Sequence, residues 1–280
     1  MADGSSIEWT QATWNPVTGC TKVSAGCKHC YAERLARRLQ AMGNPRYAAA
    51  FELTLHQDLL DLPLKWRQPR FVFVNSMSDL FHEAIPQDFL RAAFSTMEAA
   101  SWHVFQILTK RADRLAELAS HLPWPENVWM GVSVERQDLA PRVERLRQVP
   151  AAIRFLSCEP LIGPLELDLS GIHWVIVGGE SGPGARPMDL DWARTVRDQC
   201  QRQGVPFFLK QLGGTVDKRG HEQAILDGQL WRERPQPVRS SPQDAQKPAL
   251  VTGSGEAQGY LQSWQNTARP RTQLENRSVS

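Results

Sequence analysis

Three cysteines lie close together near the start of the chain, at Cys20, Cys27 and Cys30. Six residues separate the first two, two residues separate the second and third, and Gly19 and Gly26 supply turns beside them. Clustered thiolates bind soft metal centres, and a Cys-x-x-Cys pair can direct two sulfur atoms at one site. This stretch therefore predicts a metal site, and the remaining cysteines bear on which metal it holds.

The other two cysteines, Cys158 and Cys200, lie far from this cluster and from each other in the sequence. A structural zinc site closes with four protein ligands, so three cysteines alone suit an iron–sulfur cluster with one iron open to a substrate or cofactor. We rank the open cluster first, a zinc site completed by His29 or Cys158 second, and ordinary reduced thiols third. Cys200 is predicted to lie in the core, and Cys158 is either a packed thiol or a fourth ligand.

The residues that follow Cys30 predict a helix. Leu35, Leu39 and Met42 recur at helical spacing, and the residues at 43–45 read Gly-Asn-Pro, which ends a helix. Cys30 is then expected at the helix N-terminus, where the dipole and the free N–H groups favour a thiolate and an anionic cluster.

The length and composition are those of a protein with a full hydrophobic core. The 280 residues predict one large domain, residues 1–234, and a disordered tail, residues 235–280, rich in Pro, Ser, Gln and Arg. Lys and Arg number 32 against 30 Asp and Glu, so the net charge neither favours nor excludes a nucleic-acid partner. No apolar stretch approaches the roughly 20 residues that span a bilayer, which argues against a membrane protein. An odd number of cysteines without a visible signal peptide predicts a reducing, cytoplasmic setting.

Short apolar runs alternate with amphipathic, helix-like stretches over most of the chain. Six runs are candidate buried strands, and a short seventh is expected at residues 7–9; the six lie at residues 71–74, 104–108, 128–132, 153–156, 174–177 and 206–209. This alternation predicts an α/β fold of about six parallel βα units, arranged as a full or partial (β/α) barrel. A doubly wound open sheet is the alternative, because the sequence does not show closure.

Polar residues follow each of these candidate strands. Ligands of parallel α/β sheets bind beyond the carboxyl ends of the strands, so these residues are candidates for a site. They are Ser76, Ser78, Asp79, Lys110, Arg111, Ser133, Glu135, Glu159, Gly178, Gly179, Glu180 and Lys210. The cations suit a carboxylate or phosphate, and the carboxylates suit ammonium or ribose hydroxyl groups. Each residue alone is explained as a turn residue or helix cap, but six strands ending this way favour a binding site.

The cysteine stretch followed by βα units resembles the radical S-adenosylmethionine superfamily, and most closely the phage-associated three-Cys-motif family. The matching segments cover most of residues 7–234 and include residues 7–10, 13–16, 75–81, 108–111, 178–181 and 226–228, with Trp231. The usual radical enzymes place three residues between the first two cysteines, where this sequence has six. Their Gly-Gly-Glu follows the second strand, where this sequence has residues 75–79.

The resemblance implies that Cys20, Cys27 and Cys30 hold a [4Fe-4S] cluster whose fourth iron binds the amine and carboxylate of S-adenosylmethionine. It implies cofactor contacts near the amino group, and near the ribose and carboxylate, from Ser76, Ser78, Asp79, Ser133, Glu135, Gly178, Gly179 and Glu180. Reductive cleavage of the sulfonium would then yield a 5′-deoxyadenosyl radical, which abstracts hydrogen from the substrate.

The substrate expected on this reading is a nucleobase in DNA or RNA, with Lys110, Arg111, Glu159 and Lys210 on the substrate side. Two other classes remain open: a zinc-stabilised, phage-type nucleic-acid-binding protein without radical chemistry, and a structural phage protein that binds a partner protein through residues 235–280. The first requires a fourth metal ligand, and the second leaves the cysteines dispensable. The sequence identifies no catalytic residue and no oligomeric state.

Overall fold

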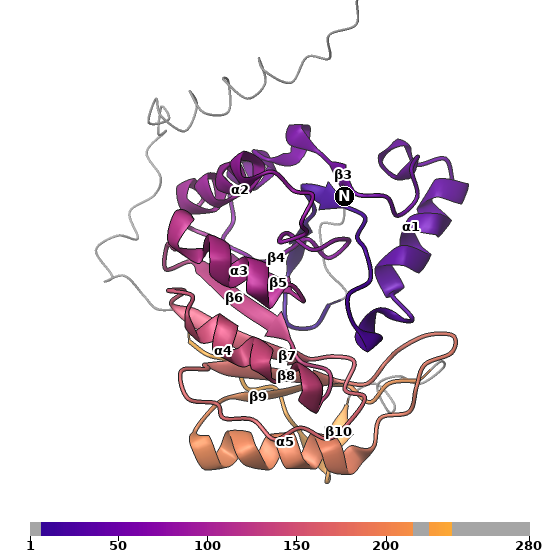
Figure 1. The fold of residues 1–280 in the computed structure, drawn as a ribbon, viewed down its shortest axis with the longest axis vertical. Helices are drawn as coiled ribbons and strands as arrows, with labels where there is room; N and C mark the ends of the chain where they lie inside the picture. The colour runs from indigo at the N-terminus through magenta and orange to yellow at the C-terminus, as the bar shows by residue number, and fades with distance from the viewer. Residues whose placement is uncertain (1–6, 215–223, 237–280) are drawn as a thin grey trace, which may run out of the picture. The chain divides into compact units, whose positions relative to one another are not determined.

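A seven-stranded parallel sheet forms the centre of the protein in the computed structural model, which describes residues 7–214 and 224–236 (Figure 1). The strands follow the order β1-β4-β5-β6-β7-β8-β9, and each neighbouring pair is parallel. Their bounds are Ala12–Trp14 (β1), Phe71–Val74 (β4), Val104–Thr109 (β5), Val128–Ser133 (β6), Ile153–Cys158 (β7), Trp174–Gly178 (β8) and Phe207–Gln211 (β9). Residues 237–280, most of the predicted tail, lie outside the described part, and the boundary at residue 235 stays a prediction.

The strand order confirms the predicted partial barrel. A doubly wound sheet reverses its strand order at a switch point, whereas here each strand pairs with the next parallel strand along the chain. Within the described residues β1 and β9 do not pair with each other, so the curled sheet is a half-barrel with two edges. The predicted short strand at residues 7–9 was wrong in position: these residues form a bend and turn, and β1 begins at Ala12.

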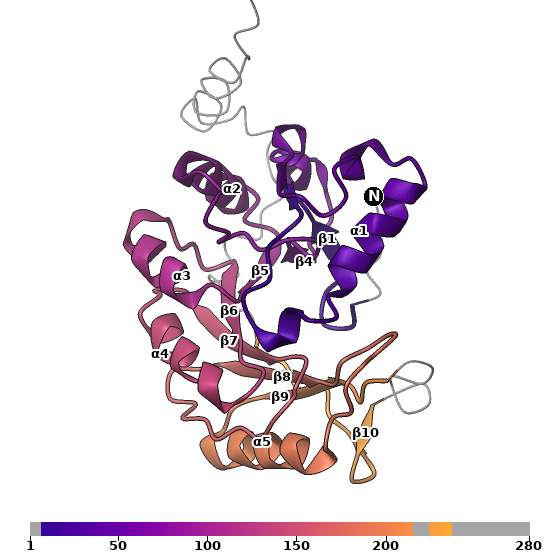
Figure 2. The ribbon, with the colours of Figure 1, turned by 45° about the vertical axis from the view of Figure 1, so that its right-hand side comes forward.

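Five α-helices accompany the sheet: Tyr31–Ala41 (α1), Gln87–Ala99 (α2), Ala112–Leu118 (α3), Pro141–Arg147 (α4) and Leu190–Gln203 (α5). Helices α2 to α5 connect successive strands and cover the outer face of the sheet, while α1 lies on the opposite side (Figures 1 and 2). Among the described helices, none is both long and apolar enough to cross a bilayer. Single 3₁₀ turns occur at Ala25–Cys27, Pro45–Tyr47, Gln57–Leu59, Leu62–Lys65, Ala119–His121 and Gln137–Leu139.

Two short strand pairs lie outside the main sheet. Val17–Thr18 (β2) pairs antiparallel with Thr54–Leu55 (β3), next to the cysteines. Ile225–Leu226 (β10) pairs antiparallel with Gln229–Leu230 (β11). The first pair ties the segment that leads to the cysteines to residues that follow α1.

Large aromatic side chains fill the inner face of the half-barrel. Trp9, Phe73, Trp129, Phe155 and Trp174 are all buried in one cluster. Several ring pairs in this cluster meet edge to face, with 4.6 Å between the centroids of Trp9 and Phe73. These tryptophans therefore serve packing. Because side chains alternate along a strand, Ser133 and Ser157 lie on the same inner face, at the carboxyl ends of β6 and β7.

Helix α1 confirms the predicted helix after Cys30 and buries its small residues. Its buried residues are Ala32 and Ala36, which contact Met77, whereas Leu35 and Met42 are exposed. Small alanine side chains let the helix backbone approach its neighbours closely, so the alanine face lies inward.

Gly131, in the middle of β6, gives a test of this packing. A Cβ built there would lie 2.5 Å from the Phe155 ring, so we expect Gly131→Ala to overpack the inner face and lower the free energy of unfolding by about 1–3 kcal/mol. Urea denaturation measures the change. Gly163→Ala is the control, because its Cβ would meet only the Arg136 side chain, at 3.2 Å. Equal stability of the Gly131 variant and wild type would contradict the packing described.

Candidate metal and cofactor site

A pocket of about 370 Å³ lies at the carboxyl ends of the parallel strands. Thirteen of the fifteen residues predicted for the site line it: Cys20, Cys27, Cys30, Ser76, Ser78, Asp79, Lys110, Arg111, Ser133, Glu159, Gly179, Glu180 and Lys210. Glu135 and Gly178 do not line it. The structure thus brings the cysteines and the strand ends together, as the βα topology predicts, while the chemical role of each residue stays a prediction.

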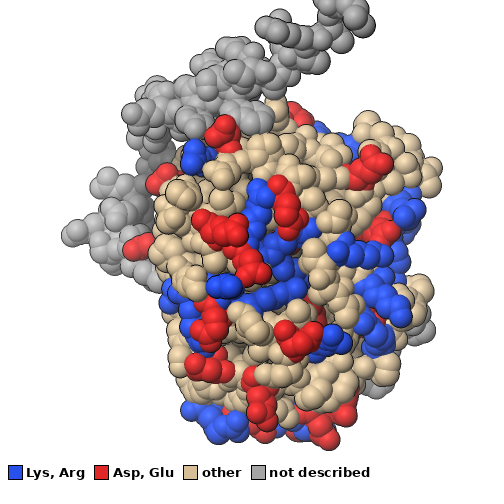
Figure 3. Space-filling view, viewed as in Figure 1, with Lys and Arg blue, Asp and Glu red and all other residues tan. Residues whose placement is uncertain are grey.

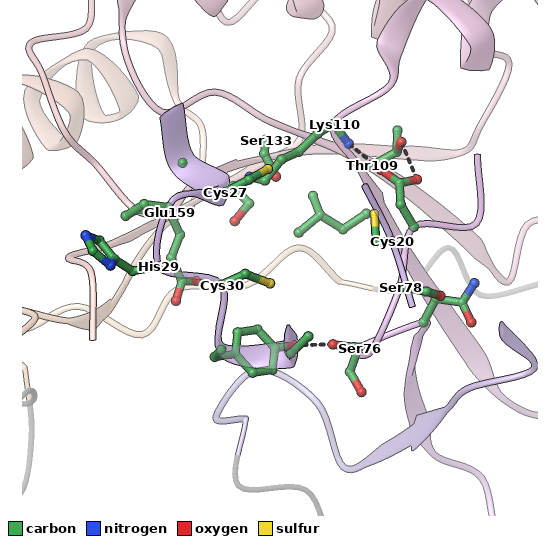
Figure 4. A pocket seen from close by; sticks show the side chains of 18 of the residues that line it. Cys20, Cys27, His29, Cys30, Ser76, Ser78, Thr109, Lys110, Ser133 and Glu159 are labelled. Carbon is green, nitrogen blue, oxygen red and sulfur yellow. Dashed lines mark hydrogen bonds between the residues drawn. The ribbon is translucent and has the colours of Figure 1, made fainter. Parts of the chain in front are cut away.

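The three cysteine sulfurs lie around one space in this pocket (Figure 4). All three cysteines are free thiols of intermediate exposure, on residues 19–30, which we call the cysteine loop. Cys27 ends the 3₁₀ turn Ala25–Cys27, and Cys30 is the N-cap of α1 with no side-chain capping bond. The predicted place of Cys30 at a helix N-terminus is confirmed.

The groups around the three cysteines bear on which metal the site could take. Among the described residues, no three His, Cys, Asp or Glu side chains converge where one metal ion would sit. The His29 ring points away from the three sulfurs (Figure 4). Cys158 follows Ser157 in β7, so its side chain points to the opposite face of the sheet, where burial raises the pKa of its thiol. Neither residue proposed to complete a zinc site therefore joins the three cysteines.

Arg111 lies beside Cys20 and holds the start of the cysteine loop. Its Nη1 is 3.7 Å from the Cys20 sulfur, and its Nη2 donates to Thr21 Oγ1 at 2.8 Å. Burial raises the pKa of the Cys20 thiol to about 11; the Asp79 carboxylate adds to the rise and Arg111 opposes it. A cation at this position therefore favours the thiolate that a metal ligand requires.

Asp79 uses its carboxylate within the protein. It accepts hydrogen bonds from Thr109 Oγ1 at 2.7 Å, from the Lys110 backbone N–H at 3.0 Å and from Arg111 at 3.4 Å. Because each carboxylate oxygen already has partners, Asp79 joins the end of β4 to the end of β5.

Two serines beside Asp79 also have partners. Ser76 Oγ donates to Asn15 Oδ1 at 3.1 Å, and Ser78 Oγ donates to the Val17 carbonyl at 2.9 Å. The same Asn15 oxygen accepts from the Met77 N–H at 3.1 Å. These bonds fix the segment after β4 against the segment that leads into the cysteine loop.

Glu135 lies behind the cysteine loop and is fully buried. Its carboxylate accepts from Ser24 Oγ at 2.7 Å and pairs with Lys110 at 2.7 Å and Arg142 at 3.0 Å. Burial alone would raise the pKa of Glu135, but Lys110, Arg142 and Ser24 outweigh burial and lower it. A Cβ at Gly26 would collide with the same carboxylate, so only glycine allows this approach. Glu135 therefore anchors the cysteine loop and presents no surface to a ribose.

A second carboxylate, Glu180, anchors the loop from the end of β8. Arg186 donates to both of its oxygens, at 2.6 and 2.8 Å, and also donates to the Ala25 carbonyl in the cysteine loop at 3.0 Å. Arg34 of α1 donates to the Ser181 carbonyl at 3.0 Å. At Gly179 a Cβ would collide with the Leu212 carbonyl, so this glycine permits close backbone packing.

The polar groups that remain open lie toward the middle of the pocket. Ser133 and Ser157 are each 2% exposed and paired in register, and neither hydroxyl makes a hydrogen bond to any described residue. Lys210 pairs with Glu159 at 2.5 Å on the same pocket wall. The two serine hydroxyls, with the three thiols, are therefore available to a ligand, whereas Lys210 and Glu159 balance each other's charge.

Sequence reasoning missed several residues that build the site. Ser24, Arg142 and Arg186 hold the two anchoring carboxylates, and Ser157 lies beside Ser133. Ser157 was detectable, because it ends a predicted strand just as Ser133 does. The arginines carried no local signal, since their partners are distant in the sequence.

The fold and the site define an α/β half-barrel protein with a three-cysteine pocket at the carboxyl ends of its strands. A family described as "Protein of unknown function (DUF5131)" matches residues 4–235, so the chain belongs to this family. A search of curated proteins finds no match. A mutant spore photoproduct lyase with bound AdoMet and dinucleoside spore photoproduct is a similar solved structure. It has 14% sequence identity and a TM-score of 0.40, and the match covers 68% of this chain and 61% of that chain.

Replacement of Glu135 tests its anchoring role. We expect Glu135→Gln to lower the free energy of unfolding of the metal-free protein by about 3–5 kcal/mol, because Lys110 and Arg142 lose their buried counter-charge. Urea denaturation measures this. Glu144→Gln removes an exposed ion pair with Arg147 and should cost less than about 1 kcal/mol. Similar losses in both variants would contradict the anchor.

The Glu180–Arg186 pair predicts a pH dependence. Burial opposes the ionised form, but Arg186 outweighs it and lowers the pKa of Glu180 in the folded state. The stabilisation is therefore full above the ordinary glutamate pKa of about 4.3 and is lost as the pH falls below it. In urea titrations at pH values from about 6 to about 3, wild type should lose more stability than Glu180→Gln. Parallel curves for the two proteins would show that the pair contributes nothing.

Proposed function

We propose that this protein is a radical S-adenosylmethionine enzyme in which Cys20, Cys27 and Cys30 hold a [4Fe-4S] cluster. The observation that carries the proposal is the placement of three free thiols around one pocket at the carboxyl ends of the strands. Three thiolates leave one iron of such a cluster open, and soft sulfur ligands suit iron–sulfur chemistry. The likeness of the motifs to the phage-associated three-Cys-motif family agrees with this proposal.

When bound and reduced, the cluster supplies the electron that cleaves S-adenosylmethionine to methionine and a 5′-deoxyadenosyl radical, which takes hydrogen from the substrate. The protein itself would position the cluster and limit the access of water to it. Glu135 and Glu180 hold the cysteine loop over the strand ends, and Arg111 places a positive charge beside Cys20. Trp9 and Phe73 close the inner end of the pocket with apolar surface, which limits the access of water.

We place S-adenosylmethionine over the ends of β4 to β8. The Ser133 hydroxyl is open and suits a ribose hydroxyl or the methionine carboxylate. Ser76, Ser78, Asp79, Gly179 and Glu180 line this part of the pocket and would border the cofactor. Ser76, Ser78 and Asp79 would do so through their backbones, since their side chains are bonded within the protein.

We place the substrate beyond the cofactor and propose a nucleobase in DNA or RNA. The support is the combination of an apolar wall, Trp9, Phe73 and Leu108, with the polar groups of Lys210 and Glu159. Apolar rings pack against the flat face of any base. Lys110 and Arg111 were predicted on this side as well, but their charges are paired with Glu135, Asp79 and Glu83. A reducing, cytoplasmic setting, in which all five cysteines stay free, agrees with this chemistry.

Anaerobic reconstitution with iron and sulfide tests the proposal. Wild type should bind about four irons per chain and, after reduction, convert S-adenosylmethionine to 5′-deoxyadenosine. Cys27→Ala should lose both, because it removes one of three ligands. Cys200→Ala is the matched control, since this thiol is buried in α5 away from the pocket and its loss should spare both.

The contrary result is equally clear. One zinc per chain, no iron uptake and no cleavage of S-adenosylmethionine would reject the radical enzyme. A zinc-stabilised nucleic-acid-binding protein would then account for the cysteines, and the fourth zinc ligand would have to come from a rearranged loop or from outside the described residues.

A further inference from the structure

Helix α1 exposes an apolar stripe beside its buried alanines. Tyr31, Leu35 and Met42 lie four and seven residues apart, with Arg38 between the last two, so all four share one face of the helix. Val23 of the cysteine loop is also exposed and lines the same pocket as Tyr31. Seven large hydrophobic side chains are exposed in the described part of the chain, and four of them are Val23, Tyr31, Leu35 and Met42.

This stripe lies in the most basic part of the sequence. Residues 22–42 hold five Lys and Arg but one Glu, a net charge of +4, whereas the whole chain carries +2. The remainder of the chain is therefore net negative. Figure 3 shows Lys and Arg gathered over α1, on the right of the view. The face therefore has an apolar centre and a basic rim. It contains Arg, Met and Tyr, which are residue types enriched at protein–protein interfaces.

The stripe begins at the metal site. Cys30 is the N-cap of α1, and Tyr31 both lines the pocket and opens the stripe. A protein bound to this face would therefore lie next to the cysteine sulfurs, while the outer helices α2 to α5 lie on the other side of the sheet (Figures 1 and 2).

Charge excludes two candidate partners for this face: residues 237–280 of the same chain and a second copy of the protein. Residues 237–280 hold five Lys and Arg against three Asp and Glu, so they would be repelled by the basic rim. A second copy would bring its own +4 segment against this one if the two stripes met. Nucleic acid matches the charge, but it would leave Val23, Leu35 and Met42 facing phosphate and sugar. An acidic protein with an apolar contact patch satisfies both the charge and the apolar stripe.

We propose that the face formed by Val23, Tyr31, Leu35, Arg38 and Met42 binds an acidic electron-transfer protein that reduces the cluster. This inference rests on the proposed function, which consumes one electron for each molecule of S-adenosylmethionine cleaved. The partner is oxidised by one electron and the cluster is reduced by one. Such redox complexes are small and transient, which suits a stripe confined to one helix and the adjoining loop. The opposite charges raise the association rate and make it sensitive to salt.

Binding is measured first, with the full chain before iron is added, because the face consists only of protein side chains. The probe is a flavodoxin, chosen as an acidic one-electron carrier. The variants are Leu35→Ser, Met42→Ser and Arg38→Glu, each at an exposed position that leaves the alanine face intact. The matched controls are Leu230→Ser, which is 40% exposed as Leu35 is, and Arg202→Glu on α5. Each α1 variant should bind about tenfold more weakly, and the controls should bind as wild type does.

Electron transfer is measured second, with the reconstituted protein. Reduction of the cluster by reduced flavodoxin should slow about tenfold in the α1 variants, while reduction by dithionite, a small reductant that needs no such face, should be unchanged. Circular dichroism checks that each variant is folded. If a serine variant unfolds, the binding and reduction rates of Arg38→Glu alone test the proposal.

Three outcomes would overturn the proposal: no binding of flavodoxin to wild type, equal binding and equal reduction rates in all variants, or an affinity for a labelled oligonucleotide that falls in the α1 variants in place of flavodoxin binding. The last would assign the face to nucleic acid. Failure of the proposed function is distinct from these, because it appears as absent iron while flavodoxin binding to the metal-free chain still depends on Leu35 and Arg38.

Discussion

The buried carboxylate of Glu135 joins the cysteine loop to the half-barrel. Removing a charge from water is unfavourable unless partners replace the lost hydration, and here Lys110, Arg142 and Ser24 do so together. Two of these partners come from the sheet side and one from the loop, so the loop cannot move away without removing a hydrogen bond from this buried carboxylate. The position of Cys27, three residues after Ser24, follows from this arrangement.

The strand ends divide into two groups with different tasks. Asp79, Glu135 and Glu180 hold backbone and side chains of neighbouring segments, and their charges are balanced by arginine or lysine. Ser133 and Ser157 keep their hydroxyls open at the bottom of the pocket. A polar residue at the carboxyl end of a strand is therefore evidence for a site as a whole, but it does not by itself mark contact with the ligand.

Much of the architecture could be predicted because the physical signals are local. The buried strands are continuous apolar runs, and all six predicted strands are present, most extended by one or two residues. β1 was misplaced because its three residues, Ala-Thr-Trp, resemble a loop more than a strand. The helix after Cys30 was predicted from Leu35, Leu39 and Met42, but its buried face was not: the close approach of the helix favours Ala32 and Ala36. The partners of Glu135 depend on three-dimensional proximity, which no local pattern encodes.

The sequential order of the strands has a consequence for how the protein is made. The cysteines leave the ribosome early, but the groups that hold their loop lie far downstream: Glu135 follows Ser24 by 111 residues and Arg186 follows Ala25 by 161. An N-terminal part of the chain that ends before β6 has the thiols without either anchor. The three sulfurs therefore reach their final arrangement only after the downstream residues that anchor their loop have been synthesised.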